Sequence, residues 1–153
     1  RHALRLSKRL TALVEVGIRD LSEEEAEFAA RHSAVSTFYD EDIKERLYIG
    51  ESFANVVDDI IRLLPDKVYV SFDIDGLQPD LCPHTGTPVA GGLGLEQTQF
   101  LIKSLVRAGK QIIGFDLCEV APNPRDVDDE WDGNVGARVL FMLSSWMMES
   151  QPV

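Results

Sequence analysis

The chain has 153 residues, 44% of them hydrophobic, and its 26 acidic against 15 basic side chains give a formal net charge of −11. This length suits one domain or part of one, and no apolar run approaches the ~20 residues that a membrane span needs. The negative field disfavours nucleic acids and anionic membranes and attracts cations, and two cysteines, Cys82 and Cys118, are too few for a disulfide framework, so we expect a cytoplasmic protein.

The first third of the chain begins with a basic segment, residues 1–10, in which Leu6 and Leu10 are four apart, as at the end of a helix. Residues 13–18, LVEVGI, are typical of a strand. Ser22 and Glu25 then form a capping box, which predicts a helix that continues to about Arg31. We expect this helix to bury two side chains, Phe28 and Ala29.

Two further helices are expected before the middle of the chain. The first starts at Asp40, and Asp42 is spaced to pair with Arg46 on its surface. The second, over residues 53–64, follows the helical period closely and is ended by Pro65. A short turn then leads into a buried strand, which is half of an α/β unit and implies a parallel sheet.

That strand, residues 68–76, has the sequence VYVSFDIDG and ends in two aspartates. Alternation along a strand predicts Asp73 and Asp75 on the same side, about 7 Å apart. Two such carboxylates repel unless a cation neutralises them, and oxygen ligands suit magnesium, calcium or manganese. The alternative is an exposed strand end whose aspartates only cap the next turn.

The remaining chain repeats the order of helix and strand. The loop of residues 77–95 is rich in proline and glycine without phosphate-binding spacing, and loops of this length are usually functional. Residues 112–120 predict a second buried strand, which makes Glu119 the third site candidate because ligands gather at the carboxyl ends of parallel strands. A helix is expected over residues 96–108, burying Phe100, Leu101 and Leu105. A last helix, residues 134–148, has the apolar face Val135, Val139, Met142, Leu143 and Trp146.

Three segments resemble the ureohydrolase family, which comprises arginase, agmatinase and formimidoylglutamase. They are SFDIDGLQP at residues 71–79 followed by PHTGTPVAGG at 83–92, FDLCEVAP at 115–122, and VGIR at 16–19. The similarity runs through nearly all of the chain but covers only the C-terminal half of the family's domain. It implies an α/β fold, three-layer α/β/α with a mostly parallel sheet, of which residues 1–153 are the C-terminal part.

The resemblance implies hydrolysis of an amidine or guanidine C–N bond by a hydroxide bound to two manganese ions (Mn2+), which lower the pKa of water. Asp73 would bridge both metals and Asp75 would bind one. Glu119 would hold the cationic amidino group through charge-assisted hydrogen bonds, and Thr87 would line the site. The resemblance also implies a homo-oligomer. The acidic charge would attract such a substrate, although acidic runs are more often solvated surface.

Two histidine-containing ligand motifs of that family, Gly-Gly-Asp-His and Asp-x-His-x-Asp, do not occur in the sequence. We therefore expect the chain alone to be inactive or nearly so. His84 lies in the signature loop, where a surface position is expected more than a catalytic one, and Gln78 replaces the family's usual aspartate before Pro79. The family's central strand would also be missing, which leaves unpaired strand edges that a complementing N-terminal half could cover.

Two other interpretations remain open. The chain could be a catalytically incomplete fragment that serves as a structural or assembly module. An Asp-x-Asp-Gly segment after a hydrophobic strand is also found in haloacid dehalogenase-like phosphatases, where the first aspartate is the nucleophile. That interpretation is weaker because Leu77, rather than a hydroxyl residue, follows Gly76.

Overall fold

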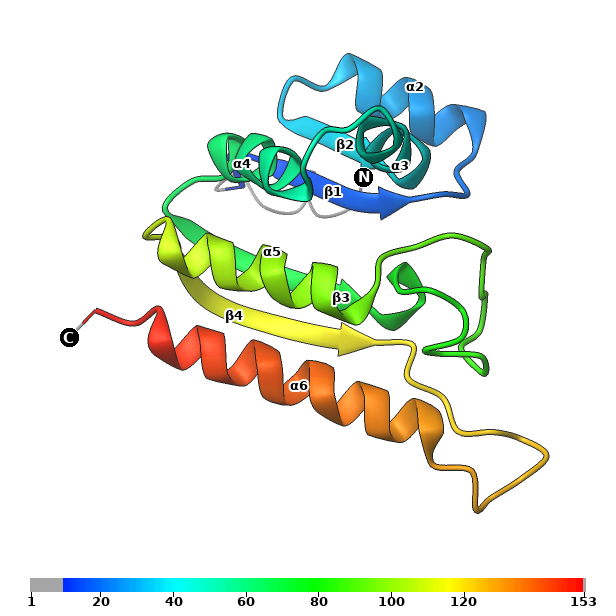
Figure 1. Cartoon of the computed structure of the whole chain (residues 1–153). Helices are drawn as coiled ribbons and strands as arrows, with labels where there is room; N and C mark the ends of the chain where they lie inside the picture. The colour runs from blue at the N-terminus through cyan, green and yellow to red at the C-terminus, as the bar shows by residue number, and fades with distance from the viewer. Residues whose placement is uncertain (1–9, 153) are drawn as a thin grey trace. The chain divides into compact units, whose positions relative to one another are not determined.

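The computed structural model of the chain describes residues 10–152, so the helix end predicted over residues 1–10 lies almost wholly outside the described residues. The chain divides into two compact units after Pro65. Each unit contains one pair of parallel strands together with helices (Figure 1). No helix within residues 10–152 is both long and apolar enough to cross a bilayer.

The first unit is built on strand β1 (Leu13–Ile18), which pairs in parallel with β2 (Val35–Tyr39). Helix α2 (Glu23–Arg31) connects the two strands, and α3 (Asp40–Tyr48) and α4 (Phe53–Leu63) follow. The sequence analysis predicts all of these elements except β2, which lies between a helix and Asp40 without a glycine or proline to mark its start.

Local sequence signals account for the start of α2 but not for its packing. The capping box is confirmed, because the Glu25 N–H donates to Ser22 Oγ at 3.2 Å and the Ser22 N–H donates to Glu25 Oε2 at 3.0 Å. The predicted burial of Phe28 and Ala29 is wrong, since α2 has no fully buried residue. Phe28 instead stacks on His32, with ring centroids 3.8 Å apart.

The predicted pair between Asp42 and Arg46 is also wrong. The Arg46 guanidinium instead donates to Glu51 Oε2 at 2.7 Å and to Asp59 Oδ2 at 2.6 Å. These carboxylates raise the pKa of Arg46, first through the hydrogen bonds to Glu51 and then through those to Asp59. Arg46 therefore joins α3, the following turn and α4 in one ion-pair network.

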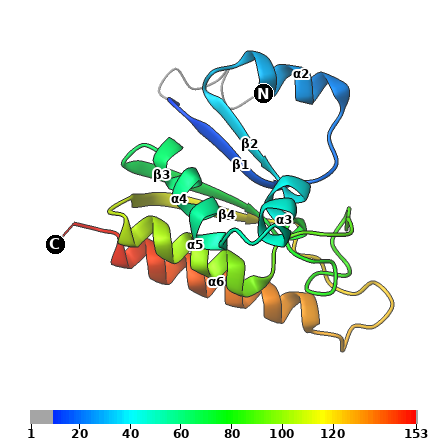
Figure 2. The same cartoon turned by 45° about the horizontal axis from the view of Figure 1, so that its top comes forward.

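The second unit contains β3 (Lys67–Asp73), which pairs in parallel with β4 (Gln111–Cys118). A short 3₁₀ helix, η1 (Ile74–Gly76), a long loop and α5 (Leu95–Arg107) lie between these strands, and α6 (Trp131–Glu149) follows them. Both helices lie on one face of the strand pair (Figure 2). The core between them includes Val68, Leu101, Leu105, Ile112, Val139 and Leu143.

Several side chains of the second unit are more exposed than predicted. Phe100 on α5 is 41% exposed, and Trp146 on α6 is only half-buried. On the face of the strand pair opposite the helices, Tyr69 and Ile113 are 57% and 56% exposed. In a buried parallel sheet, helices cover the side chains on both faces. This unit therefore has only one of the two helical layers that enclose such a sheet.

The fold class is confirmed as an incomplete α/β fold with parallel strands. Within residues 10–152, the four strands form two separate pairs, β1 with β2 and β3 with β4. Each strand therefore has one edge without a hydrogen-bonded partner strand in this part of the chain.

Candidate active site

The predicted site residues gather at the carboxyl ends of β3 and β4. Asp73 is the last residue of β3 and pairs in register with Cys118, the last residue of β4. Glu119 follows directly, and Asp75 lies in η1. The topology therefore brings the three predicted carboxylates to one edge of the strand pair, which is the edge where ligands bind in α/β proteins.

A turn, and not strand alternation, relates Asp73 to Asp75. The strand ends two residues earlier than needed for the predicted alternation, because Ile74 begins the 3₁₀ helix. Asp73 Oδ1 accepts a hydrogen bond from the Asp75 N–H at 3.2 Å. Asp73 thus caps the turn, as the alternative interpretation expects, and at the same time this bond fixes where Asp75 lies.

The charges at this edge repel one another. Loss of hydration raises the pKa of Asp73, and the nearby carboxylates of Asp75 and Glu119 raise it further, against the lowering effect of the hydrogen bond from the Asp75 N–H. Asp73 nevertheless remains exposed at the surface. Carboxylates that gather at one strand end in this way form a cluster that a cation would stabilise.

The loop after η1 holds this cluster from the other side. Thr87 Oγ1 donates to Asp75 Oδ2 at 3.0 Å, and Thr85 Oγ1 donates to the backbone carbonyl of Glu119 at 3.0 Å. Between them, a Cβ atom on Gly86 would lie 2.9 Å from Glu119 Oε2, so the glycine leaves room for that carboxylate. The loop therefore brings together Thr87, Asp75 and Glu119, three of the four residues that the sequence predicts; their roles stay predictions.

Glu119 has an unusual backbone conformation that the sequence analysis misses. Its φ of 65° makes it the one described non-glycine residue in the left-handed region. That conformation is costly for a residue with a side chain and is often found at functional sites. The hydrogen bond from Thr85, which is itself buried, holds the Glu119 carbonyl in this arrangement.

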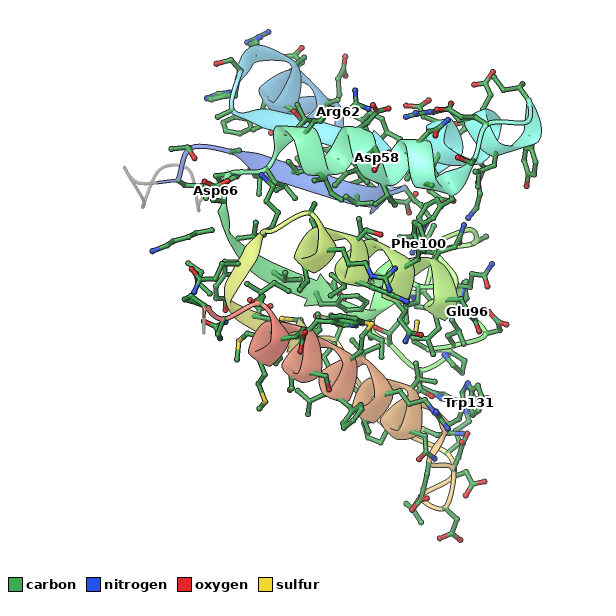
Figure 3. The ribbon with its side chains drawn as sticks, turned by 60° about the vertical axis from the view of Figure 1, so that its left-hand side comes forward. Asp58, Arg62, Asp66, Glu96, Phe100 and Trp131 are labelled. Carbon is green, nitrogen blue, oxygen red and sulfur yellow. The ribbon has the colours of Figure 1, made fainter. Side chains whose placement is uncertain are left out.

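His84 is half-buried and bound to a carboxylate, rather than lying free on the loop surface. Its Nδ1 lies 2.8 Å from Asp132 Oδ2, and its backbone N–H donates to Asp132 Oδ1 at 3.0 Å. The neighbouring Trp131, at the start of α6 (Figure 3), donates from Nε1 to the Asp80 carbonyl at 2.8 Å. Asp132 carries no local sequence signal, because its partner lies 48 residues away.

Asp116, on β4, makes a side-chain hydrogen bond across the two strands. Its Oδ1 accepts from Ser71 Oγ at 2.9 Å and from Cys118 Sγ at 3.3 Å. Burial would raise the pKa of Asp116, but hydrogen bonds from Cys118, Ser71 and Tyr69 lower it overall. Its carboxylate is therefore stabilised within the strand pair, unlike that of Asp73.

Two carboxylates at this edge are of the kind that binds metal ions. Asp73 and Asp75 offer the oxygen ligands that manganese or magnesium accepts. Across residues 10–152, however, no group of three histidine, cysteine, aspartate or glutamate side chains is arranged to hold a metal ion.

Comparisons with known proteins identify the family that this chain resembles. The sequence model of the Arginase family matches residues 1–144. N(1)-aminopropylagmatine ureohydrolase of Thermus thermophilus is 37% identical over 112 residues, which are 72% of this chain and 35% of that protein. Arginase-1 of Oryctolagus cuniculus is 28% identical over 134 residues, which are 88% of this chain and 41% of that protein.

Solved structures share the fold. Arginase from Bacillus caldovelox superposes with a TM-score of 0.71 and 26% identity, over 88% of this chain and 43% of that chain. Proclavaminate amidino hydrolase from Streptomyces clavuligerus gives a TM-score of 0.70 and 25% identity, over 92% of this chain and 43% of that chain. The chain therefore spans less than half the length of these relatives.

Proposed function

Because the chain belongs to the Arginase family, we propose that it forms part of the active site of an amidinohydrolase, which hydrolyses a C–N bond of a linear amidine or guanidine. One observation carries the proposal: Asp73, Asp75, Thr87 and Glu119 gather at the carboxyl ends of two parallel strands. The names of relatives, which include arginase and proclavaminate amidino hydrolase, support the reaction class.

Each residue has a role suited to a cationic substrate. Glu119 would accept hydrogen bonds from the amidino nitrogens, and the Thr87 hydroxyl would lie beside the same group. Asp73 and Asp75 would be ligands of two manganese ions, which, when bound, supply a nucleophile near neutral pH. The raised pKa of Asp73 supports this role, because a bound cation would relieve the repulsion among the carboxylates.

The remaining metal ligands would come from a complementing N-terminal half, in the same polypeptide or in another chain. Two observations support this proposal. The chain covers only 35% of its Thermus relative, and one face of the β3–β4 pair leaves Tyr69 and Ile113 exposed. The outer side of α6 also exposes Phe141 and Met148, at 75% and 72%, which supports a homo-oligomer.

A second candidate is a structural or assembly module that keeps the fold without the activity. The observation that favours it is that residues 10–152 contain no three-residue metal site. The family match favours both of these candidates over the phosphatase interpretation of the Asp-x-Asp-Gly segment.

The test uses the longest native form of the protein, including any reading frame upstream of residue 1, supplied with manganese. Hydrolysis of arginine, agmatine, N(1)-aminopropylagmatine and formimidoylglutamate is measured for the wild type and for Asp75→Ala. Asp66→Ala is the matched control, since Asp66 is an exposed aspartate at the opposite end of β3 (Figure 3).

We expect the wild type to hydrolyse at least one substrate, and Asp75→Ala to lose at least about 100-fold in kcat/KM, because even indirect supports of a metal often cost 10- to 100-fold. Asp66→Ala should match the wild type. Hydrolysis that Asp75→Ala leaves unchanged would refute the proposed site. The absence of hydrolysis and of manganese binding in the longest form would favour the structural module.

A further inference from the structure

The described residues connect the candidate site to the start of α6 through one histidine. Asp132, in the first turn of α6, is only 3% exposed, and both of its carboxylate oxygens bind His84. An ionised carboxylate only accepts hydrogen bonds, so the imidazole donates from Nδ1 while the backbone donates from N. The first turn of a helix also favours a negative side chain.

We propose that His84 is a positioning residue, which fixes residues 84–87 on α6 so that Thr85 and Thr87 reach Glu119 and Asp75. This role rests on the proposed function of these residues. His84 would support the site without touching the reacting atoms. His84 itself touches α6, and through the loop backbone it acts on the carboxylates.

Four consecutive residues of the loop make contacts with four different places. His84 binds Asp132 on α6 and Thr85 binds the Glu119 carbonyl. Gly86 faces the Glu119 carboxylate, and Thr87 binds Asp75 in η1. Because consecutive Cα atoms stay about 3.8 Å apart, a displacement of His84 would pull on the adjacent residues that make the two threonine contacts.

Side-chain hydrogen bonds, more than backbone hydrogen bonds, hold the middle of this loop in place. Backbone hydrogen bonds close its ends, from the Gln78 N–H to the Leu93 carbonyl at 3.0 Å and from the Leu93 N–H to the Gly76 carbonyl at 3.1 Å. The Thr85 N–H makes a longer bond of 3.3 Å to the Cys82 carbonyl. Loss of the His84 contact would therefore loosen the segment between these closed ends.

A substitution of His84 would act mainly through the loss of its hydrogen-bond donor, because the side chain lies at an open surface. The His84 side chain is 23% exposed and lines an open cavity of about 430 Å³, together with Asn123 and Arg125. A smaller or apolar side chain at this position would therefore leave no sealed void. It would leave buried Asp132 without a side-chain donor, which is costly for a charged group.

The test compares His84→Leu, which removes the donor, with His84→Asn, whose amide nitrogen replaces Nδ1. Asp132→Asn removes the charge while keeping the shape of the partner. The control is His32→Leu, because the ring of His32 also makes a hydrogen bond through Nδ1, to the Phe28 carbonyl at 2.8 Å, in the other unit.

Hydrogen exchange measured by mass spectrometry reports the loop directly, without any need for activity. We expect His84→Leu to speed exchange by at least about tenfold in peptides covering residues 84–90 and 117–123, because a lost bond to a charge costs more than a neutral one. Peptides from α5 should be unchanged. His84→Asn and His32→Leu should resemble the wild type in both regions.

Steady-state kinetics of the longest native form give the second measurement. We expect His84→Leu to raise KM by at least about tenfold, because Glu119 would be displaced, and His84→Asn to restore the wild-type KM. A partly unfolded enzyme would instead lose kcat at unchanged KM. If His84→Leu lowers the thermal midpoint of the whole protein, Asp132→Asn makes the same comparison and is expected to speed exchange in the same two peptides.

Unchanged exchange at residues 117–123 in both His84→Leu and Asp132→Asn would overturn the inference, even if the enzyme were active. Fast exchange there in a protein without hydrolase activity would support the positioning role while contradicting the proposed function. The two ideas therefore fail separately.

Discussion

The two units of the chain place acidic residues after parallel strands but use them differently. In the first unit, buried Asp40 follows β2 and lies 3.5 Å from the Lys44 ammonium on α3. In the second unit, Asp73, Asp75 and Glu119 lie at the carboxyl ends of β3 and β4, where the charges of Asp75 and Glu119 act on Asp73. The first arrangement places an acid beside a base, and the second places acids beside acids.

The difference is visible in the direction of the pKa changes. In the first unit, bonds to Glu51 and Asp59 raise the pKa of Arg46, so two carboxylates stabilise the positive charge of this side chain. In the second unit, loss of hydration and two neighbouring carboxylates raise the pKa of Asp73, which makes its ionised form less stable. Acids beside a base support the fold, whereas acids beside acids favour a bound cation, and this contrast leads to four predictions.

The largest effect is expected for Glu119→Gln, which removes the charge that would bind an amidino group and keeps the shape of the side chain. KM should rise by roughly 10- to 100-fold, because a hydrogen bond to a charged group contributes about 1.5–3 kcal/mol. Steady-state kinetics of the longest native form measure this change. Glu96→Gln, at an exposed residue in the first turn of α5, is the control, and an equal KM for both variants would contradict the role of Glu119.

Gly86→Ala should follow, because its new Cβ would lie 2.9 Å from Glu119 Oε2 and displace that carboxylate. A loss of roughly tenfold in kcat/KM is expected, since small displacements of positioning groups can cost up to 100-fold. Gly133→Ala, where a Cβ meets nothing within 4 Å, is the matched control and should keep full activity. Normal kinetics in Gly86→Ala would mean that the Glu119 carboxylate does not need this space.

Arg46→Gln tests the other side of the comparison, since it should weaken the fold without changing the site. We expect a loss of about 1 kcal/mol in the free energy of unfolding, measured with urea, because Arg46 is half-buried between two carboxylates. Arg62→Gln, at an exposed arginine that binds the same Asp59, should lose less than about 0.5 kcal/mol. Equal losses would show that the Arg46 network stabilises the fold no more than the exposed Arg62–Asp59 pair does.

The smallest expected effect is a gain in thermal stability. Asp73 has a raised pKa in the folded chain, so the folded state binds more protons than the unfolded state in the window between the two pKa values. Stability therefore falls as the pH rises through that window. Without metal, Asp73→Asn should raise Tm by no more than about 2 °C near pH 7, because solvent screens an exposed charge.

Thermal unfolding measured over a range of pH tests whether stability falls as the pH rises. The advantage of Asp73→Asn should shrink as the pH falls toward the pKa of Asp73, where the wild-type carboxyl becomes neutral. A variant that is less stable than the wild type at every pH would show that the capping bond to the Asp75 N–H outweighs the repulsion.

Features that depend on neighbours in the sequence could be predicted. The Ser22–Glu25 capping box, the helix ended by Pro65 and the strand that leads to Asp73 each follow from residues within one or two turns. The approach of Asp73 to Glu119 also follows, because parallel strands place their carboxyl ends at one edge, whereas Thr87 is predicted only from the family resemblance.

Features that depend on distant partners could not be predicted. Asp132 binds His84 from 48 residues away, and Arg46 prefers Asp59, 13 residues away, to its helical neighbour Asp42. The left-handed backbone of Glu119 depends on the hydrogen bond from Thr85, 34 residues earlier. In each case the tertiary contact decides between local conformations that the sequence leaves equally open.

Calorimetric titration of manganese into the longest native form of the protein tests the central claim, that the carboxyl ends of β3 and β4 contribute to a metal-dependent amidino site. The account predicts about two ions per chain, in line with a two-metal hydrolytic site, and the loss of at least one in Asp75→Asn. A protein that binds no manganese, or an Asp75→Asn variant that binds it like the wild type, would contradict the account.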